Sequence, residues 1–200
     1  LDAAERIFFT KGYRSATMDD VAKEAEYSKR TVYVYFSSKE QIYFEIMIRG
    51  YRLLIEMLES GLQKEKAPDA IEEIRRIASI LYRFSNQHPD YFDAIMEYEN
   101  NAIDFQKGIP DHSKEECYAL GERLLGYLMD ALKRGIQEGS VRGGLNVEKS
   151  ALALWACTVG VFRTAKKKKY YIGNYHGIDP EDLVSEGFSM MIRAIRTETE

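Results

Sequence analysis

The residues with the clearest chemical signature lie between Thr17 and Lys39, in the segment TMDDVAKEAEYSKRTVYVYFSSK. In a helix that begins after Ser28, side chains rotate by about 100° per residue, so Arg30, Thr31 and Val34 share one face. A guanidinium, a hydroxyl and a methyl-bearing side chain match the acceptors and methyl groups that base edges offer in a major groove. This face therefore predicts readout of nucleic acid bases.

The flanks of the same helix carry groups suited to phosphates. Lys29 and Tyr33 lie on one flank and Tyr35 on the other, and ammonium and phenol groups are useful phosphate donors. The span from Lys29 to Lys39 holds three cations and no acid. The alternative interpretation is an ordinary solvated helix of a helical bundle.

Two short helices position these side chains. Thr17 with Asp20 forms a capping-box pattern that starts the first helix, and Ser28 caps a second helix that runs to about Phe36. The link between them is short, at Glu26–Tyr27. Such a pair is typical of a helix-turn-helix. The residues expected to face inward share helical spacing: Met18, Val21, Ala22 and Ala25 on the first helix, Val32 and Phe36 on the second.

Over roughly its first quarter, the chain resembles the TetR family of bacterial transcriptional regulators. The matching residues are Gly12-Tyr13, Ala16-Thr17, Val21-Ala22, Ser28-Lys29, Thr31, Tyr33-Val34-Tyr35-Phe36 and Ser38-Lys39-Glu40. The resemblance implies contacts to double-stranded operator DNA from Thr17, Ser28, Lys29, Arg30, Thr31, Tyr33, Tyr35 and Lys39. It also implies a small-molecule effector, of unknown identity, bound among the middle helices.

The chain departs from the family pattern at Glu26, where the tight turn usually has a small residue, often glycine. A non-glycine residue with positive φ is strained, so we expect an irregular turn there. An acid at this place also opposes DNA slightly.

Composition limits the remaining classes of function. The chain has 28 Lys and Arg against 32 Asp and Glu, a formal charge of −4, so DNA affinity must come from local placement of cations. Two cysteines are too few for a disulfide framework, and the three histidines are too scattered for a metal site. No phosphate-binding glycine loop or nucleophile elbow occurs. We expect no catalytic residue, no cofactor, no metal, no membrane segment and a cytoplasmic location.

The rest of the chain is predicted to be all-α. We predict a helix-turn-helix DNA-binding domain of three helices at residues 1–47 and a larger helical domain for effector binding and dimerisation at 48–200. A long helix from about Lys39 to Gln63 links them. Later helices are expected to about Gln87, from Pro89, from Ser113, from Ser150 to Lys169 and from Pro180, with a Gly/Asn/Tyr loop before the last. The run Lys166–Lys169 is attributed to the dipole at a helix C-terminus.

Two further sets of residues are candidate sites in the larger domain. Aromatic side chains at helical positions suit an amphipathic ligand, although each is more often core. These are Tyr51, Phe84, Phe92, Tyr98, Tyr127 and Trp155. The apolar faces of the last two long helices predict a dimer interface through Phe162, Val184, Gly187, Phe188, Met191 and Ile195, with Gly187 allowing close approach.

The sequence thus favours a ligand-responsive transcriptional regulator, most simply a repressor, that binds a near-palindromic operator as a dimer. Two alternatives stay open. One is an architectural DNA-binding protein without an effector, which a tightly packed large domain would favour. The other is a helical enzyme or adaptor with a vestigial DNA motif, which paired titratable groups in a site would favour.

Overall fold

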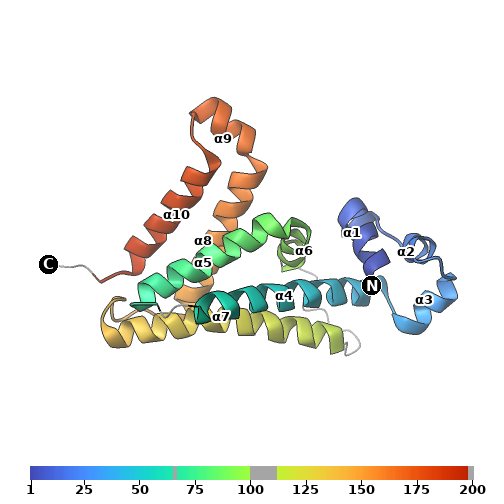
Figure 1. Ribbon diagram of the computed structural model, residues 1–200, viewed down its shortest axis with the longest axis horizontal. Coiled ribbons are helices and arrows are strands. Elements are labelled where there is room, and N and C mark those ends of the chain that lie inside the picture. The colour runs from blue at the N-terminus through green and yellow to red at the C-terminus, as the bar shows by residue number, and fades with distance from the viewer. Residues whose placement is uncertain (65–66, 100–111, 198–200) are drawn as a thin grey trace. The chain divides into compact units, whose positions relative to one another are not determined.

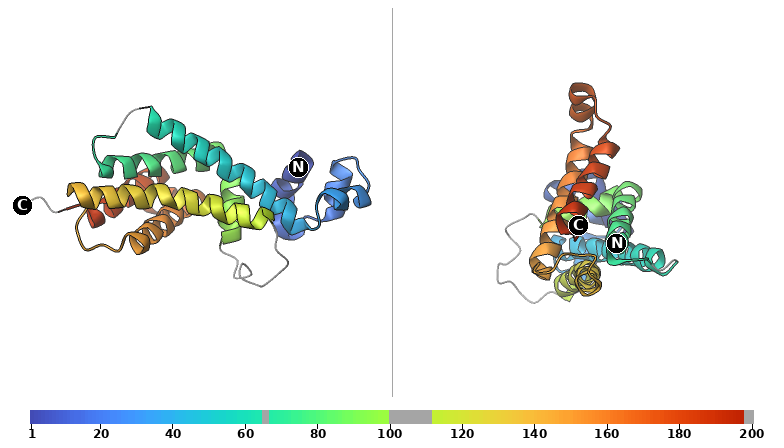
Figure 2. Two further views of the ribbon diagram at one scale, coloured as in Figure 1. Left: turned by 90° about the horizontal axis from the view of Figure 1, so that it is seen from below. Right: turned by 90° about the vertical axis from the view of Figure 1, so that its left-hand side faces the viewer.

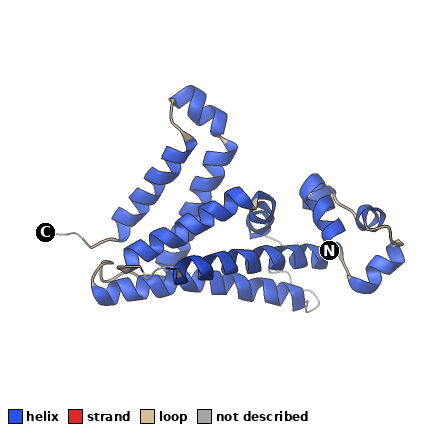
Figure 3. Cartoon of the chain, viewed as in Figure 1, coloured by secondary structure: helices blue, strands red, loops and turns tan. Residues whose placement is uncertain are grey.

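The computed structural model describes residues 1–64, 67–99 and 112–197, and its regular elements are helices (Figures 1 and 3). Within these ranges they are α1 (Asp2–Ser15), α2 (Met18–Glu24), α3 (Lys29–Tyr35), α4 (Lys39–Gln63), α5 (Ala70–Gln87), α6 (Pro89–Glu99), α7 (His112–Glu138), α8 (Val147–Lys167), α9 (Lys169–His176) and α10 (Pro180–Ile195). None of the helices described is long and apolar enough to cross a membrane.

The chain groups into two compact units. The first comprises Leu1–Leu54 with His88–Gly121, and the second Ile55–Gln87 with Glu122–Glu200. Helices α4 and α7 each contribute residues to both units, whereas α6 belongs wholly to the first. The sequence-predicted boundary at residue 47 follows a different criterion, the end of the DNA-reading motif, and stays a prediction.

In the first unit the core forms around the start of α4. Six of the seven residues from Ile42 to Ile48 are buried, and the Tyr43 hydroxyl among them donates to the Ala94 carbonyl of α6 at 3.3 Å. The rings of Phe8 and Tyr43 lie 5.4 Å apart. The beginning of α4 is therefore held by both α1 and α6, and α2 and α3 belong to the same unit.

A polar cluster ties α1 to α4 and α6 in the same unit. Arg49 contacts Asp2 at 2.7 Å and Glu5 at 3.0 Å, and the hydroxyl of Tyr91 donates to Glu5 at 2.8 Å. The hydrogen bond from Arg49 lowers the pKa of Asp2. One arginine thus connects three helices of the first unit.

In the second unit α5 supplies the main apolar stripe, and α8 and α10 pack side by side as a hairpin (Figure 1). Gly187 of α10 lies against Val161 of α8, and a β-carbon at residue 187 would approach the Val161 side chain to 3.0 Å. The small residue therefore permits close packing between two helices of one chain.

Sequence and structure differ in three places. Gly12, a residue typical of a helix end, takes positive φ, but α1 continues past it to Ser15. Helix α8 begins at Val147 rather than Ser150, because Asn146 caps it by accepting from the Lys149 amide. The prediction of a Gly/Asn/Tyr loop before the last helix is wrong, because most of that segment forms the short helix α9.

Candidate nucleic-acid interface and internal cavity

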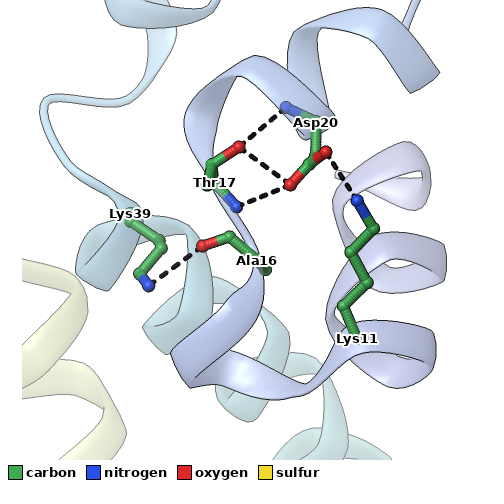
Figure 4. A network of polar contacts seen from close by, with 5 residues as sticks. All are labelled: Lys11, Ala16, Thr17, Asp20 and Lys39. Carbon is green, nitrogen blue, oxygen red and sulfur yellow. Dashed lines mark hydrogen bonds and ion pairs between the residues drawn. The ribbon is translucent and has the colours of Figure 1, made fainter.

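Helices α2 and α3 are started by the predicted caps. The Thr17 hydroxyl accepts from the Asp20 amide at 3.1 Å, and the Asp20 carboxylate accepts from the Thr17 amide at 3.0 Å (Figure 4). Ser28 accepts from the Thr31 amide at 3.1 Å and starts α3. Because Lys11 also donates to Asp20, at 2.6 Å, the pKa of Asp20 falls to about 2.

The turn between α2 and α3 is strained as the sequence predicts. Glu26 has φ of 57°, the one positive value at a non-glycine position in the described residues. The left-handed conformation is costly for a residue with a β-carbon. The acid is exposed and stands directly before the reading helix.

Helix α3 turns a chemically mixed face outward. Val32 is buried beneath it, while Val34 is 76% exposed and Tyr35 is 71% exposed. Single exposed apolar side chains are ordinary, but here four gather within nine residues: Tyr27, Tyr33, Val34 and Tyr35. Exposed methyl and phenol groups beside cations are what a helix needs to contact base edges and phosphates.

The cations of this surface differ in availability. Arg30 is exposed, and among the described residues no carboxylate pairs with it. Lys29 is paired with Asp19 at 2.8 Å, and that hydrogen bond raises the pKa of the Lys29 ammonium. Lys29 must therefore exchange an internal carboxylate for any phosphate it contacts.

Lys39, the third expected cation, points inward instead. Its Nζ donates to the carbonyl oxygen of Ala16 at 3.0 Å (Figure 4). It also donates to the carbonyl oxygen of Tyr13 at 2.8 Å and lies 4.5 Å from the centre of the Tyr13 ring. These contacts tie the first residue of α4 to the junction between α1 and α2. The sequence pattern did not reveal this role, because its partners are backbone carbonyl oxygens, which every residue type has.

The second unit contains a partly open cavity of about 190 Å³ between α4, α5, α7, α8 and α10. Most of its lining is aliphatic or aromatic, with polar groups from Arg75, Thr158, Ser185 and Ser189. The apolar lining residues are Leu58, Ile74, Ile77, Ala78, Leu81, Leu124, Leu125, Leu128, Leu154, Trp155, Phe188, Met191 and Ile192. Such a lining suits a ligand that is mostly apolar with one polar end.

Of the six aromatic ligand candidates, Trp155 lines this cavity. Phe84 is buried in the second unit, and Tyr51 and Phe92 are buried in the first. Tyr127 donates its hydroxyl to Glu59 at 2.6 Å; burial is the main cause that raises its pKa. The side chain of Tyr98 lies outside the described residues. The cavity lining that sequence reasoning missed is aliphatic. The apolar stripe on α5 is the sequence feature that could have indicated it.

The six predicted interface residues mostly face the interior of their own unit. Phe162, Val184 and Ile195 are buried, while Phe188 and Met191 line the cavity. Gly187 serves the contact between α8 and α10 described above. A single chain does not test dimerisation, but within it these residues already pack against α8 and α10 or line the cavity.

The described residues contain no group of three or more His, Cys, Asp or Glu placed to hold a metal ion. His112 is exposed next to Glu115, and Cys117 is buried while Cys157 is exposed. The two features that the described residues offer are the exposed face of α3 and the apolar cavity of the second unit.

Comparison with known proteins agrees with both features. The family model of bacterial regulatory proteins, tetR family, matches residues 1–46. The fatty acid metabolism regulator protein of Bacillus subtilis is 30% identical over 150 residues, which cover 74% of this chain and 71% of that protein. The HTH-type transcriptional repressor NicS of Pseudomonas putida is 22% identical over 154 residues, covering 77% and 69%.

The fold is shared over nearly the whole length. The crystal structure of the transcriptional regulator FadR from Bacillus subtilis in complex with stearoyl-CoA superposes with a TM-score of 0.69 at 21% identity, covering 96% of this chain and 95% of that one. The chain therefore belongs to the tetR family of bacterial regulatory proteins and is a ligand-responsive DNA-binding transcriptional regulator.

Proposed function

We propose that this regulator is a repressor that binds a near-palindromic operator as a homodimer and leaves it when an amphipathic anion with an acyl-type chain enters the second unit. The observation that carries this proposal is the apolar cavity with an arginine at its edge. A packed second unit without a cavity would instead favour the architectural alternative.

The chemistry of the cavity supports the ligand class. An apolar cavity of 150 Å³ accepts benzene, so about 190 Å³ accepts only part of a long chain before the helices must move apart. Arg75 is exposed at the lining and has no carboxylate partner among the described residues, which leaves its guanidinium available for a carboxylate or phosphate head group. The relatives named for fatty acid metabolism and solved with stearoyl-CoA support the same class.

The requirement for movement supplies a route to DNA. Leu58, in the second half of α4, lines the cavity, and Lys39 at the start of the same helix holds the α1–α2 junction. A chain too long for the resting cavity displaces Leu58 and with it α4. The ligand then favours one shape of the protein over another, and couplings of this kind are commonly about 1–3 kcal/mol.

DNA readout is assigned to the exposed face of α3. Arg30 is expected to contact a guanine at two points, with Thr31 and Val34 beside it, and Lys29, Tyr33 and Tyr35 on the phosphates. Thr17 and Ser28 stand at the starts of α2 and α3, where backbone amides also face phosphates. A two-fold dimer then reads half-sites about 34–36 Å apart.

The dimer contact is assigned to exposed small and apolar residues of the α8–α10 hairpin. Along α8 they recur at helical spacing on the face opposite the buried Thr158 and Phe162, and Met190 adds to them from α10. They are Leu152, Ala153, Ala156, Cys157 and Gly160. This set replaces the buried residues of the sequence-based prediction as the accessible face.

The test is a titration of protein on an operator selected from random duplexes, using lauroyl-coenzyme A and free laurate as probes and fluorescence anisotropy of the DNA as the signal. Release of DNA is expected. Ala78→Phe, which fills the cavity, should abolish the response, whereas Ser79→Phe on the exposed side of α5 should not. Arg75→Ala should weaken the response and the exposed Arg83→Ala should not.

Saturation of the cavity with either probe, without any change in DNA affinity, would refute the switch. If neither probe binds the protein and neither changes its DNA affinity, an acyl-type anion is not the effector. Arg30→Ala should lose about 1–3 kcal/mol on the selected operator and less on random DNA.

A further inference from the structure

The tip of the α8–α10 hairpin exposes a second cluster of large apolar side chains. Tyr170 is 81% exposed, Tyr175 77%, Tyr171 55% and Ile178 44%. Figure 1 and the right-hand view of Figure 2 show α9 at the end of this hairpin. Contiguous apolar groups left open to this degree mark an interaction surface rather than ordinary exterior.

The tip is locally ordered although its aromatic side chains lack cover. Ile172 is the buried anchor of α9, and Gly177 ends the helix with φ of 66°. The rings of Tyr171 and Tyr175 stack with centres 5.5 Å apart, and His176 meets the Tyr171 ring edge-on at 4.8 Å. Because these rings already support one another, little conformational freedom is lost when a partner covers them.

The lysines of the tip are not explained by helix dipoles alone. Lys166 and Lys167 lie in the last turn of α8, where cations are favoured, but Lys169 is the first residue of α9, where they are disfavoured. Lys167, Lys168 and Lys169 are exposed, and in the described part of the chain none forms an ion pair with a carboxylate. Their placement suggests a partner outside this chain.

Carboxylates stand at the same end of the hairpin. Asp179 caps α10, and Glu181 and Asp182 follow in its first turn, all three exposed. With Lys166 the tip has four lysines against these three carboxylates, so its net charge is only about +1 and a polyanion such as DNA or an acidic membrane gains little there. In a two-fold interface, however, the lysines of each copy can face the carboxylates of the other, so that the same attractive contact forms twice.

We propose that the α9 tip is an arm that recognises a second copy of this chain, with Lys167–Lys169 of each copy facing the Asp179–Asp182 carboxylates of the other and the tyrosines covered between them. This inference rests on the homodimer of the proposed function and goes beyond it. The small-residue face of α8 provides contact area, and the arm selects the partner. Charge patterns of this kind set partner choice more than affinity.

The test exchanges the charges. One full-length variant carries Lys167→Glu, Lys168→Glu and Lys169→Glu, and a second carries Glu181→Lys and Asp182→Lys. Each alone should dimerise roughly tenfold more weakly or worse, because like charges face each other. An equimolar mixture should form heterodimers about as well as the unmodified protein, because both contacts are then attractive. Sedimentation equilibrium measures all three, and circular dichroism verifies that each variant folds.

The outcomes separate the two proposals. A dimeric unmodified protein whose variants dimerise normally overturns the arm but leaves the homodimer. An unmodified protein that is monomeric at micromolar concentration overturns both. Variants that stay dimeric but lose DNA affinity and salt dependence would make the lysines a nucleic-acid contact, and a mixture that fails to recover would show that the variants act through folding; either result overturns the arm.

Discussion

Replacing Lys39 by methionine distinguishes a DNA contact from a structural tie. Methionine keeps the apolar stem and removes the ammonium that contacts the carbonyl oxygens of Tyr13 and Ala16. A hydrogen bond to a charged group contributes about 1.5–3 kcal/mol. Since Lys39 is half-exposed and water can replace part of these contacts, we take about 2 kcal/mol for the whole set.

A loss of about 2 kcal/mol lowers the Tm of a chain of this length by roughly 4–8 °C. DNA affinity should fall on specific and random sequences alike, because the α1–α2 junction is no longer held. The slope of log Kd against log salt should not change, since no phosphate contact is removed. Lys29→Met is the matched control: it should reduce the slope by about 0.9 and leave Tm nearly constant.

The assays are differential scanning fluorimetry and anisotropy titrations at several salt concentrations. An unchanged Tm for Lys39→Met, together with a slope reduced by about 0.9, would place the ammonium on a phosphate. That result would refute the structural tie and restore the role implied by the family resemblance.

Substitutions at four other positions give distinct readouts. Asp20→Asn should lower Tm at neutral pH, and the difference should shrink as pH falls from 3.8 towards about 2, because a carboxylate with a lowered pKa stabilises the fold only while it is ionised; a constant difference across this window contradicts the assignment. Glu26→Gly should stabilise by about 0.5–1 kcal/mol in urea unfolding and tighten DNA binding, while Glu26→Asn separates charge from backbone strain. Gly160→Glu should yield monomers in sedimentation, whereas Phe188→Glu should lower Tm and abolish binding of the probe with the dimer intact; monomers from Phe188→Glu alone would return the interface to the buried set.

Local features of the DNA-reading motif could be predicted from the sequence. The caps at Thr17 and Ser28, the buried Val32, the exposed Val34 and the strained Glu26 all follow from interactions within a few residues along the chain. The long helix α4 was predicted with its observed bounds because its apolar stripe persists over many turns. The family resemblance rests on the same local pattern.

The sequence did not determine which surface each apolar stripe covers. The stripes of α8 and α10 were assigned to a partner subunit, yet Phe162 and Val184 pack within the chain, and Phe188 borders its cavity. Hydrophobic periodicity identifies the face that leaves water, but a helix of the same chain and one of a second copy are equally good cover. The structure shows which part of each stripe packs within the chain, and the interface with a second copy stays a prediction.

The same limit applies to polar groups and to empty space. The ammonium of Lys39 is bound by backbone carbonyls, which every residue possesses, so residue types could not distinguish this tie from a phosphate contact. The cavity depends on how well helices α4, α5, α7, α8 and α10 fill the volume between them, which no single segment encodes. Interactions between residues close along the chain can be predicted from the sequence, because residue types and spacing determine them. Contacts between distant segments depend on how the whole chain packs.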